Sequence, residues 1–280
     1  AIDAAQTAYD QKTAEKIYKA DSLKTLQQAI AAAQAVYDTK GTANEKNEEE
    51  VAAAVTTLNN AVKAPMELKD FEEMNQVMTA YYPMDQDVKD TTANHHDGTV
   101  NGDVTFPNGD SAVFPGSEKG LTNYISLPTD MAVTNQMTFS FWTYTEAGGG
   151  NNVFGISSGK DMSSAHHFSI YTSNGEKLSA NGGKTGYSGP AGVDNIPFAA
   201  EEWHLVTCVV NGTDLTFYVD GEEAKAGTIG ASLTEVWNAH EAERNIYIGN
   251  NVYAWNNNGL HDKDYKGRIK NFRIYNAALA

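Results

Sequence analysis

An abrupt change in composition near residue 65 most constrains how this chain can fold. Residues 1–64 contain runs of alanine and a single glycine, Gly41, whereas the rest of the chain carries the other 23 glycines and all four tryptophans. A chain of 280 residues also exceeds the usual size of one domain. We therefore expect two domains of different structural class, with a small helical one first.

The first 66 residues show the period of amphipathic helices. Their apolar side chains recur at spacings of three and four in two sets, namely Leu23, Leu26, Ile30, Ala33 and Tyr37, and then Val51, Val55, Leu58 and Val62. A preceding segment with Ile2, Tyr9 and Ile17 is predicted as a third helix. Asp21 or Ser22 is predicted to cap the middle helix and Asn47 the last one, with Gly41 and Pro65 as the stops. Short helices bury their faces only against each other, so we expect a three-helix bundle over residues 1–66.

After a linker predicted at residues 67–77, the period changes to two. In the segment 138–144, Phe139 and Phe141 fall on one face of a strand, and Ser140 and Trp142 fall on the other. Turn signals separate such runs, at Asn101-Gly102, Asn108-Gly109, Asn174-Gly175, Asn211-Gly212 and Asp220-Gly221. Many strands joined by tight turns favour one large antiparallel β-sandwich over residues 78–280.

Seven short segments follow one another in the second part. They are Tyr82-Pro-Met-Asp85, Asp97-Gly98, Thr138-Phe-Ser-Phe-Trp142, Glu202-Trp-His204, Tyr218-Val-Asp-Gly221, Ile248-Gly249 and Gly267-Arg-Ile-Lys-Asn-Phe-Arg-Ile-Tyr275. In this order they resemble a laminin-G-like domain of the concanavalin A-like superfamily. The resemblance implies a jelly-roll sandwich, often attached in bacteria to secreted glycosidases or adhesins. The helical part, over about residues 14–64, is similar to the FIVAR module of large Gram-positive surface proteins and glycosidases.

The charge of the chain argues against two classes of partner. The formal net charge is −16, and residues after Asp70 carry 25 acidic and 12 basic side chains, which is −13 of that total. Such a surface repels phosphate backbones and anionic lipid. No apolar run reaches membrane-spanning length. We expect neither nucleic-acid binding nor membrane insertion.

The acidic residues do not form the catalytic pattern that glucanases of this superfamily need. Such an enzyme requires carboxylates at alternate positions of one strand, projecting into a cleft. The acids here cluster at turns or in adjacent pairs such as Glu201-Glu202, whose side chains point to opposite faces of a strand. We predict that this part of the protein is not an enzyme.

One polar loop contains the groups that bind sugars. An aromatic ring packs against the C–H face of a pyranose, and amides exchange paired hydrogen bonds with its hydroxyls. The loop 250–258 offers Trp255 and Tyr253 among five asparagines, and it follows a predicted strand end at Ile248-Gly249. The predicted ligand-binding residues are Trp255, Tyr253, Asn250, Asn251, Asn256, His167, Tyr171 and Asn152. The alternative is that the asparagines only form turns and that Trp255 packs on the sandwich edge.

Calcium is the metal that the resemblance implies, because relatives often hold such an ion at the end of the sandwich. Asp85 occupies the acidic position of the first-strand motif, with Asp90 and Asp97 nearby. These three residues are the predicted ligands of a structural Ca²⁺. The alternative is that they are solvated loop charges.

Together these patterns predict a non-catalytic carbohydrate-binding region of a larger secreted or cell-surface glycosidase or adhesin. Its partner is expected to be a glycan held by the rim loops, and its parent chain is expected to add catalytic or surface domains. The resemblances imply a protein of a Gram-positive bacterium. Because surface proteins of such bacteria also tend to lack cysteine, the single cysteine, Cys208, does not show whether the protein is cytosolic or secreted. The alternative function is a structural spacer or adhesion module that binds protein at the cell surface.

Overall fold

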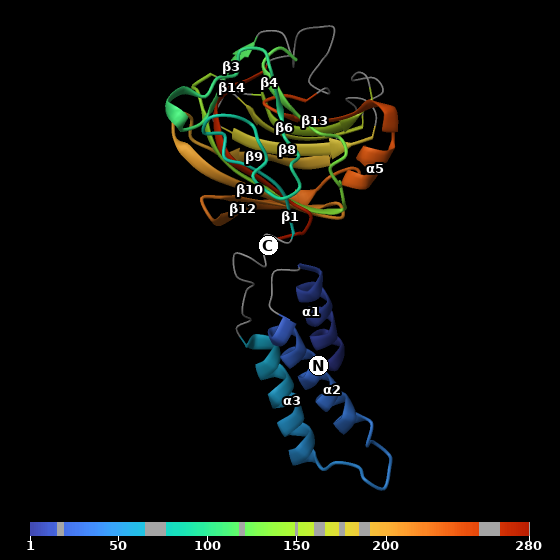
Figure 1. Ribbon diagram of the computed structural model, residues 1–280. Helices are drawn as coiled ribbons and strands as arrows, with labels where there is room; N and C mark the ends of the chain where they lie inside the picture. Colours follow the sequence, from blue (N-terminus) through green and yellow to red (C-terminus); the bar gives the residue numbers. More distant parts are fainter. Residues whose placement is uncertain are drawn as a thin grey trace. The chain divides into compact units, whose positions relative to one another are not determined.

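The computed structural model describes residues 1–15, 20–64, 77–117, 121–148, 151–159, 166–173, 177–184, 191–251 and 264–279 (Figure 1). The chain divides into two compact units. Ala1–Val77 and Ala277–Ala280 form the first, which we call the helical unit, and Met78–Asn276 form the second, which we call the sandwich unit. The predicted linker at residues 67–77 lies outside the described residues except for Val77.

The helical unit contains the three predicted helices. They are α1 (Ile2–Glu15), α2 (Ala20–Tyr37) and α3 (Glu48–Lys63). Their shared core consists of Ala5, Leu26, Ile30, Ala33 and Leu58. Asp21 lies in the first turn of α2, so the predicted cap at Asp21 or Ser22 is wrong, because the helix is already formed at Ala20. None of the described helices is long and apolar enough to cross a membrane.

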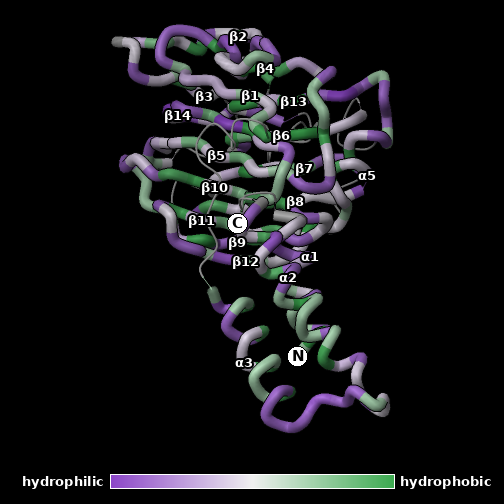
Figure 2. The backbone as a smooth tube through the Cα atoms, turned by 60° about the horizontal axis from the view of Figure 1, so that its bottom comes forward, coloured by the Kyte–Doolittle hydropathy of each residue, from purple (hydrophilic) through white to green (hydrophobic). Residues whose placement is uncertain are grey.

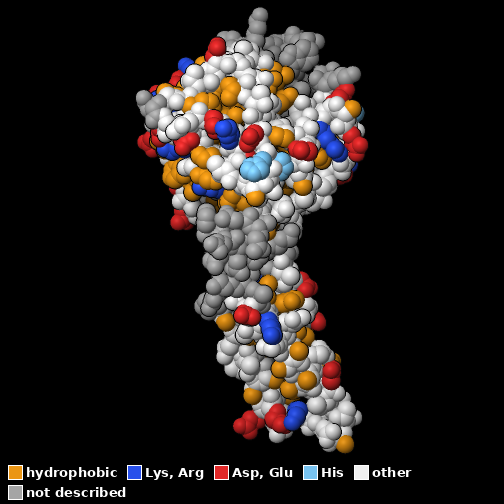
Figure 3. All heavy atoms as spheres, in the orientation of Figure 1, with side chains coloured by type: hydrophobic (Ala, Val, Ile, Leu, Met, Phe, Trp, Pro, Cys, Tyr) orange, Lys and Arg blue, Asp and Glu red, His pale blue; other side chains and the backbone are white. Residues whose placement is uncertain are grey.

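The apolar face of the bundle is only partly covered. Tyr37, Val51 and Val55, which were predicted to pack, are 60%, 43% and 39% exposed. They line an open groove of about 500 Å³, together with residues that include Ala33 and Leu58. Figure 3 shows hydrophobic side chains gathered along this unit. The predicted faces therefore exist, but α2 and α3 do not close over them at this end.

Asn47 caps α3 as predicted. Its side-chain oxygen accepts a hydrogen bond from the Glu50 amide at 2.9 Å, and the Glu50 carboxylate accepts one from the Asn47 amide at 3.0 Å. This reciprocal pair satisfies two amides that have no partner within the helix. We expect Asn47→Ala to lower the free energy of unfolding of the helical unit by about 1 kcal/mol. Thermal melts followed by far-ultraviolet circular dichroism would measure this, and a melt unchanged from wild type would contradict it.

The sandwich unit has fourteen described strands. They are β1 (Met78–Tyr82), β2 (Thr99–Asn101), β3 (Ala112–Ser117), β4 (Tyr124–Leu127), β5 (Gln136–Thr145), β6 (Asn151–Ser158), β7 (His166–Ser173), β8 (Lys177–Gly183), β9 (Ala191–Pro197), β10 (Trp203–Asn211), β11 (Asp214–Val219), β12 (Glu222–Thr228), β13 (Arg244–Ile248) and β14 (Asp264–Tyr275). A short helix, α5 (Leu233–Asn238), and two 3₁₀ turns, η1 (Pro107–Gly109) and η2 (Glu241–Glu243), lie between strands.

These strands form the two layers of an antiparallel jelly-roll sandwich, which confirms the predicted fold class. One layer has the order β12-β11-β10-β5-β14, with β1 and β3 also paired to β14. The other layer has β2-β4-β13-β6 and continues through β7, β8 and β9. A single parallel bridge between Asp264 and Asn152 joins the layers, and every other described strand pairing is antiparallel.

The core lies between the layers and is built from aromatic rings. Phe272 of β14 stacks on Phe141 of β5 with centroids 5.0 Å apart, and it contacts Phe154 of β6 at 5.2 Å. Phe139 of β5 contacts Phe154 at 4.7 Å. Figure 2 shows hydrophobic residues recurring along the strands that enclose this core. The predicted alternation of segment 138–144 is confirmed, since Phe139 and Phe141 are fully buried and Trp142 is not.

The turn predicted at Asn211-Gly212 is confirmed, because it joins β10 and β11 in a hairpin in which Gly212 has a φ of +69°. β1 pairs with β14, so the first and last strands of the sandwich lie side by side. Cys208 is fully buried in β10.

Candidate functional site

The side of the β13-β6-β7-β8 layer that points away from the core is polar, and its Ser157, His167, Ser169 and Ser179 are buried. Ile156, Phe168, Ile170, Leu178 and Ala180 belong to the core, so the residues that alternate with them point away from it. Apart from Lys177 at the start of β8, these outward residues are uncharged and rich in hydrogen-bonding groups. We call them the polar face, which consists of Ser157, His167, Ser169, Tyr171, Ser179 and Asn181, with Asn245 and Tyr247 of β13 and Tyr124 of β4.

The strand register brings these side chains into rows. Tyr247 lies beside Gly155, Gly155 beside Ser169, and Ser169 beside Asn181. In the next row, Asn245 lies beside Ser157 and Ser157 beside His167. Asn152 lies beside Tyr171, so the structure brings these two predicted ligand residues together. Both are half-buried.

Asn250 and Asn251, two of the predicted ligand-binding residues, have fully buried side chains. The Asn251 side-chain amide donates to the Phe168 carbonyl oxygen at 3.2 Å and to Ser169 Oγ. It folds over Gly155, where a Cβ would lie 2.4 Å from Asn251 Cγ. Asn250 donates through its side chain to Asp264 and accepts from the Asn251 amide at 2.6 Å. These asparagines therefore fasten the chain to the polar face instead of presenting free amides to a ligand.

Asp264 anchors the loop that leads into Tyr124. Its carboxylate accepts from the amides of Thr122 at 3.1 Å and Asn123 at 2.6 Å. Burial raises the pKa of Asp264 above its ordinary value, although these amide hydrogen bonds oppose the shift. The loop, β14 and Asn250 are thus held together around one buried carboxyl group, which positions Tyr124 at the edge of the polar face.

His167, another predicted ligand-binding residue, is also fully buried. Its Nε2 lies 3.2 Å from Asn181 Oδ1. Burial lowers the pKa of His167 to about 4, so the imidazole is neutral near pH 7. His167 therefore acts by orienting the half-buried Asn181.

Tyr124, Asn245 and Tyr247, which the sequence analysis did not single out, add two aromatic rings and an amide to the polar face. The rings of Tyr124 and Tyr247 lie 4.8 Å apart, and the Tyr247 hydroxyl donates to Asn245 Oδ1 at 2.7 Å. All three are half-buried, and burial raises the pKa of Tyr247 to about 12. The alternation in the segment Arg244-Asn-Ile-Tyr-Ile248 indicates that Asn245 and Tyr247 point away from the core, since Ile246 and Ile248 are core residues.

Ser157 has unused hydrogen-bonding capacity in the middle of this surface. It is 1% exposed, and its Oγ has no hydrogen-bond partner among the residues that the structure describes. Buried hydroxyls in proteins almost always have a partner. The half-buried rings and amides of the polar face can pack against sugar rings and exchange hydrogen bonds with their hydroxyls.

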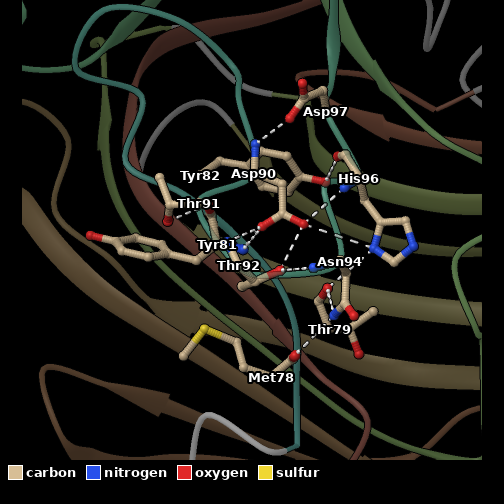
Figure 4. A network of polar contacts seen from close by, with 10 residues as sticks. All are labelled: Met78, Thr79, Tyr81, Tyr82, Asp90, Thr91, Thr92, Asn94, His96 and Asp97. Atoms are coloured by element: carbon tan, nitrogen blue, oxygen red, sulfur yellow. Dashed lines mark hydrogen bonds and ion pairs between the residues drawn. The ribbon is translucent and has the colours of Figure 1, made fainter.

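Two of the three predicted metal ligands, Asp90 and Asp97, belong to a hydrogen-bond network (Figure 4). The Asp90 carboxylate accepts from the backbone amides of Tyr81 at 3.0 Å, Thr92 at 2.9 Å and His96 at 2.9 Å. It also accepts from the Thr92 hydroxyl at 2.8 Å. Burial opposes ionisation of Asp90, but these hydrogen bonds outweigh it and hold its pKa below the ordinary value.

The network occupies two of the three predicted ligands, Asp90 and Asp97. Asp97 accepts from the Asp90 amide at 3.0 Å, and Asp85 is exposed. Among the described ranges, no group of three or more His, Cys, Asp or Glu side chains could hold a metal ion. Protein donors already occupy Asp90, and calcium binding by Asp85, Asp90 and Asp97 stays a prediction.

The remaining predicted ligand residues, Tyr253, Trp255 and Asn256, lie outside the described residues. Their role stays a prediction.

Comparison with known families decides the classification of the sandwich unit. The family model described as the concanavalin A-like lectin/glucanases superfamily, of laminin-G type, matches residues 118–280. The chain belongs to this superfamily. Membership confirms the resemblance seen in the strand motifs, and the β1–β14 pairing joins Met78–Tyr82 to the same sandwich. The match does not include the helical unit, whose similarity to the FIVAR module stays a prediction.

Solved structures share the superfamily fold. Domain 4 of AbnA, a GH43 extracellular arabinanase from Geobacillus stearothermophilus in complex with arabinotriose, is 22% identical, with a TM-score of 0.53 over 72% of this chain and 94% of that one. The binding domain of botulinum neurotoxin serotype D is 13% identical, with a TM-score of 0.51 over 74% of this chain and 50% of that one. At these identities the likeness concerns the fold alone. A search of curated proteins finds no significant match.

Proposed function

We propose that this chain is a non-catalytic carbohydrate-binding region of a larger secreted or cell-surface glycosidase or adhesin of a Gram-positive bacterium. The observation that carries the proposal is the polar face, where Tyr247, Asn245 and Tyr171 combine aromatic rings with amides on a rigid sheet. The arabinanase domain with the same fold is in complex with an oligosaccharide, which supports an oligosaccharide as the ligand class.

One further observation supports the absence of catalysis. A glycosidase needs two carboxyl groups that face its substrate. Among the residues that the structure describes in the sandwich unit, the two buried carboxylates are Asp90 and Asp264, and both are engaged by backbone amides. We therefore propose that any catalytic activity belongs to other domains of the parent protein.

A glycan array with the full chain tests the binding function. We expect binding to oligosaccharides, and we expect Tyr247→Ala and Tyr171→Ala each to weaken it about tenfold, because each removes a ring from the polar face. Tyr218→Ala is the matched control, since Tyr218 is a half-buried tyrosine on β11, in the opposite layer. It is expected to bind as wild type does.

The controls separate a folding defect from a binding defect. Every variant must keep the wild-type near-ultraviolet circular dichroism spectrum. Folded variants that bind as tightly as wild type would place the sugar elsewhere, whereas an array without any bound glycan would contradict the function itself. The same array with and without chelator tests the calcium prediction.

The groove of the helical unit favours the second candidate function, a spacer or adhesion module that binds protein. Tyr37, Val51 and Val55 expose apolar surface there that a protein partner would cover. A chain that binds no glycan but adheres to protein-coated surfaces, with adhesion lost on Val55→Asp, would support this alternative.

A further inference from the structure

The outward face of β14 carries a line of positive charge. Lys266, Arg268 and Lys270 alternate with Gly267 and Ile269, which are buried. A bulge follows, at Asn271 with a φ of +53°. After this extra residue Arg273 points outward again, because its neighbours Phe272 and Ile274 belong to the core. One strand face thus holds four of the twelve basic residues that follow Asp70.

Aromatic rings from neighbouring strands lie beside three of these cations. The Arg268 guanidinium carbon lies 5.0 Å from the centroid of the Tyr144 ring, and Lys270 Nζ lies 4.2 Å from that of Trp203. Arg273 lies 4.2 Å from the Tyr81 ring. The Tyr144 and Trp203 rings are themselves 5.8 Å apart. We call Arg268, Lys270, Arg273, Tyr81, Tyr144 and Trp203 the basic–aromatic face.

Much of this charge is available to a partner. Lys270 pairs with Asp110 at 3.3 Å and Lys266 with Glu146 at 3.1 Å, and both carboxylates are substantially exposed. Such surface pairs are worth only about 0–1 kcal/mol, so an incoming anion can replace them. Arg268 and Arg273 have no carboxylate within ion-pair distance among the described residues, although the whole chain has a net charge of −16.

The spacing of the cations fits a linear partner. Successive outward residues on a strand are roughly 7 Å apart, so Arg268 and Arg273 are separated by about 15 Å along β14. Guanidinium groups bind carboxylates and sulfates through paired hydrogen bonds, and aromatic rings pack against the C–H faces of sugars. A chain of acidic sugars offers both features at a regular repeat.

We infer that the basic–aromatic face binds an acidic polysaccharide whose charges are carboxylates or sulfates. This surface lies on the β14-β5-β10 layer, whereas the polar face lies on the other layer, so the two surfaces are independent. The inference therefore adds a second ligand class and does not rest on the function of the polar face.

Isothermal titration of the full chain with polygalacturonate, dextran sulfate and neutral dextran at low salt tests this inference. We expect binding to one or both acidic polymers, weakening as salt increases, and none to neutral dextran. The double variant Arg268→Ala/Arg273→Ala should bind at least about tenfold more weakly. Which of the two acidic polymers binds identifies the anionic group.

A matched control removes the same charge elsewhere. Lys177 of β8 and Lys225 of β12 are exposed, so Lys177→Ala/Lys225→Ala should keep wild-type affinity. The charge-preserving double variant Arg268→Lys/Arg273→Lys should keep part of the affinity for the acidic polymer. This result would show that the alanine variant loses binding because it loses charge and not because it fails to fold. No binding to either acidic polymer, an equal loss in the control, or equally tight binding of polyglutamate would overturn the inference.

Discussion

Asp90→Ala is expected to lower the free energy of unfolding of the sandwich unit by about 3–5 kcal/mol. Asp90 is 4% exposed, and its removal would leave the amides of Tyr81, Thr92 and His96 without their acceptor. Denaturant unfolding followed by tryptophan fluorescence would measure the loss. Asp90→Asn keeps the shape of the side chain and one carbonyl acceptor. We therefore expect its free energy of unfolding to lie between those of Asp90→Ala and wild type.

A neighbouring aspartate provides the control. Asp87 is exposed and lies 3.8 Å from Lys89, so Asp87→Ala is expected to change stability by no more than about 0.5 kcal/mol. Equal stabilities of the Asp87 and Asp90 alanine variants would show that the network in Figure 4 contributes nothing.

The pH dependence of this network has a definite sign. The pKa of Asp90 is lower in the folded state than in the unfolded chain, so the folded state binds fewer protons in that range. Its contribution is fully present above the ordinary aspartate pKa and is lost as the pH falls through the folded-state value. Wild type should therefore lose more stability than Asp90→Asn when the pH is lowered below about 4.

The second large effect is expected at the centre of the core. Phe272→Ala should destabilise the sandwich unit by about 3–5 kcal/mol, because it opens a cavity between Phe141 and Phe154 and thus between the two layers. Phe272→Leu retains much of the side-chain volume, so its loss of unfolding free energy should be less than half of that of Phe272→Ala. The same denaturant unfolding measurement distinguishes the two variants.

A double-mutant cycle isolates the ring stacking. Phe141 and Phe272 are nearly parallel, at an interplanar angle of 10°. We expect a coupling energy between their alanine variants of about 0.5–1.5 kcal/mol. Strictly additive losses would mean that the two rings act only through the area that each buries.

Local patterns predicted those parts of the fold in which alternation is regular. Phe139, Phe141 and Trp142 follow the period of two, and Asn47 caps its helix through hydrogen bonds with Glu50, three residues later. Tyr37 and Val55 lie on the predicted helix faces, but how far those faces close depends on how three helices meet. Periodicity identifies which side chains share a helix face, but it does not show how much of that face the neighbouring helices cover.

The candidate site was less predictable because its decisive contacts are distant in sequence. Asn250 and Asn251 are in a loop of polar residues, and nothing local indicates that Asn251 folds over Gly155, a glycine ninety-six positions earlier. Asn245 and Tyr247 could have been found, because they alternate with two isoleucines of the core.

Net charge was also an incomplete guide. It describes the average surface, whereas Lys266, Arg268 and Lys270 gather on one strand face through a simple alternation that the printed sequence already contains. Arg273 joins the same strand face only because of the bulge at Asn271. The extra residue there shifts every later side chain of β14 to the opposite face of the sheet.

The position of β14 also has a consequence for biosynthesis. β14 occupies the interior of its layer, between β5 on one side and β1 and β3 on the other, yet it is the last strand along the chain. While a ribosome is still translating residues before Asp264, those three partners expose unpaired edges. The domain therefore matures after synthesis of its final strand, and nascent chains are expected to depend on chaperones until then.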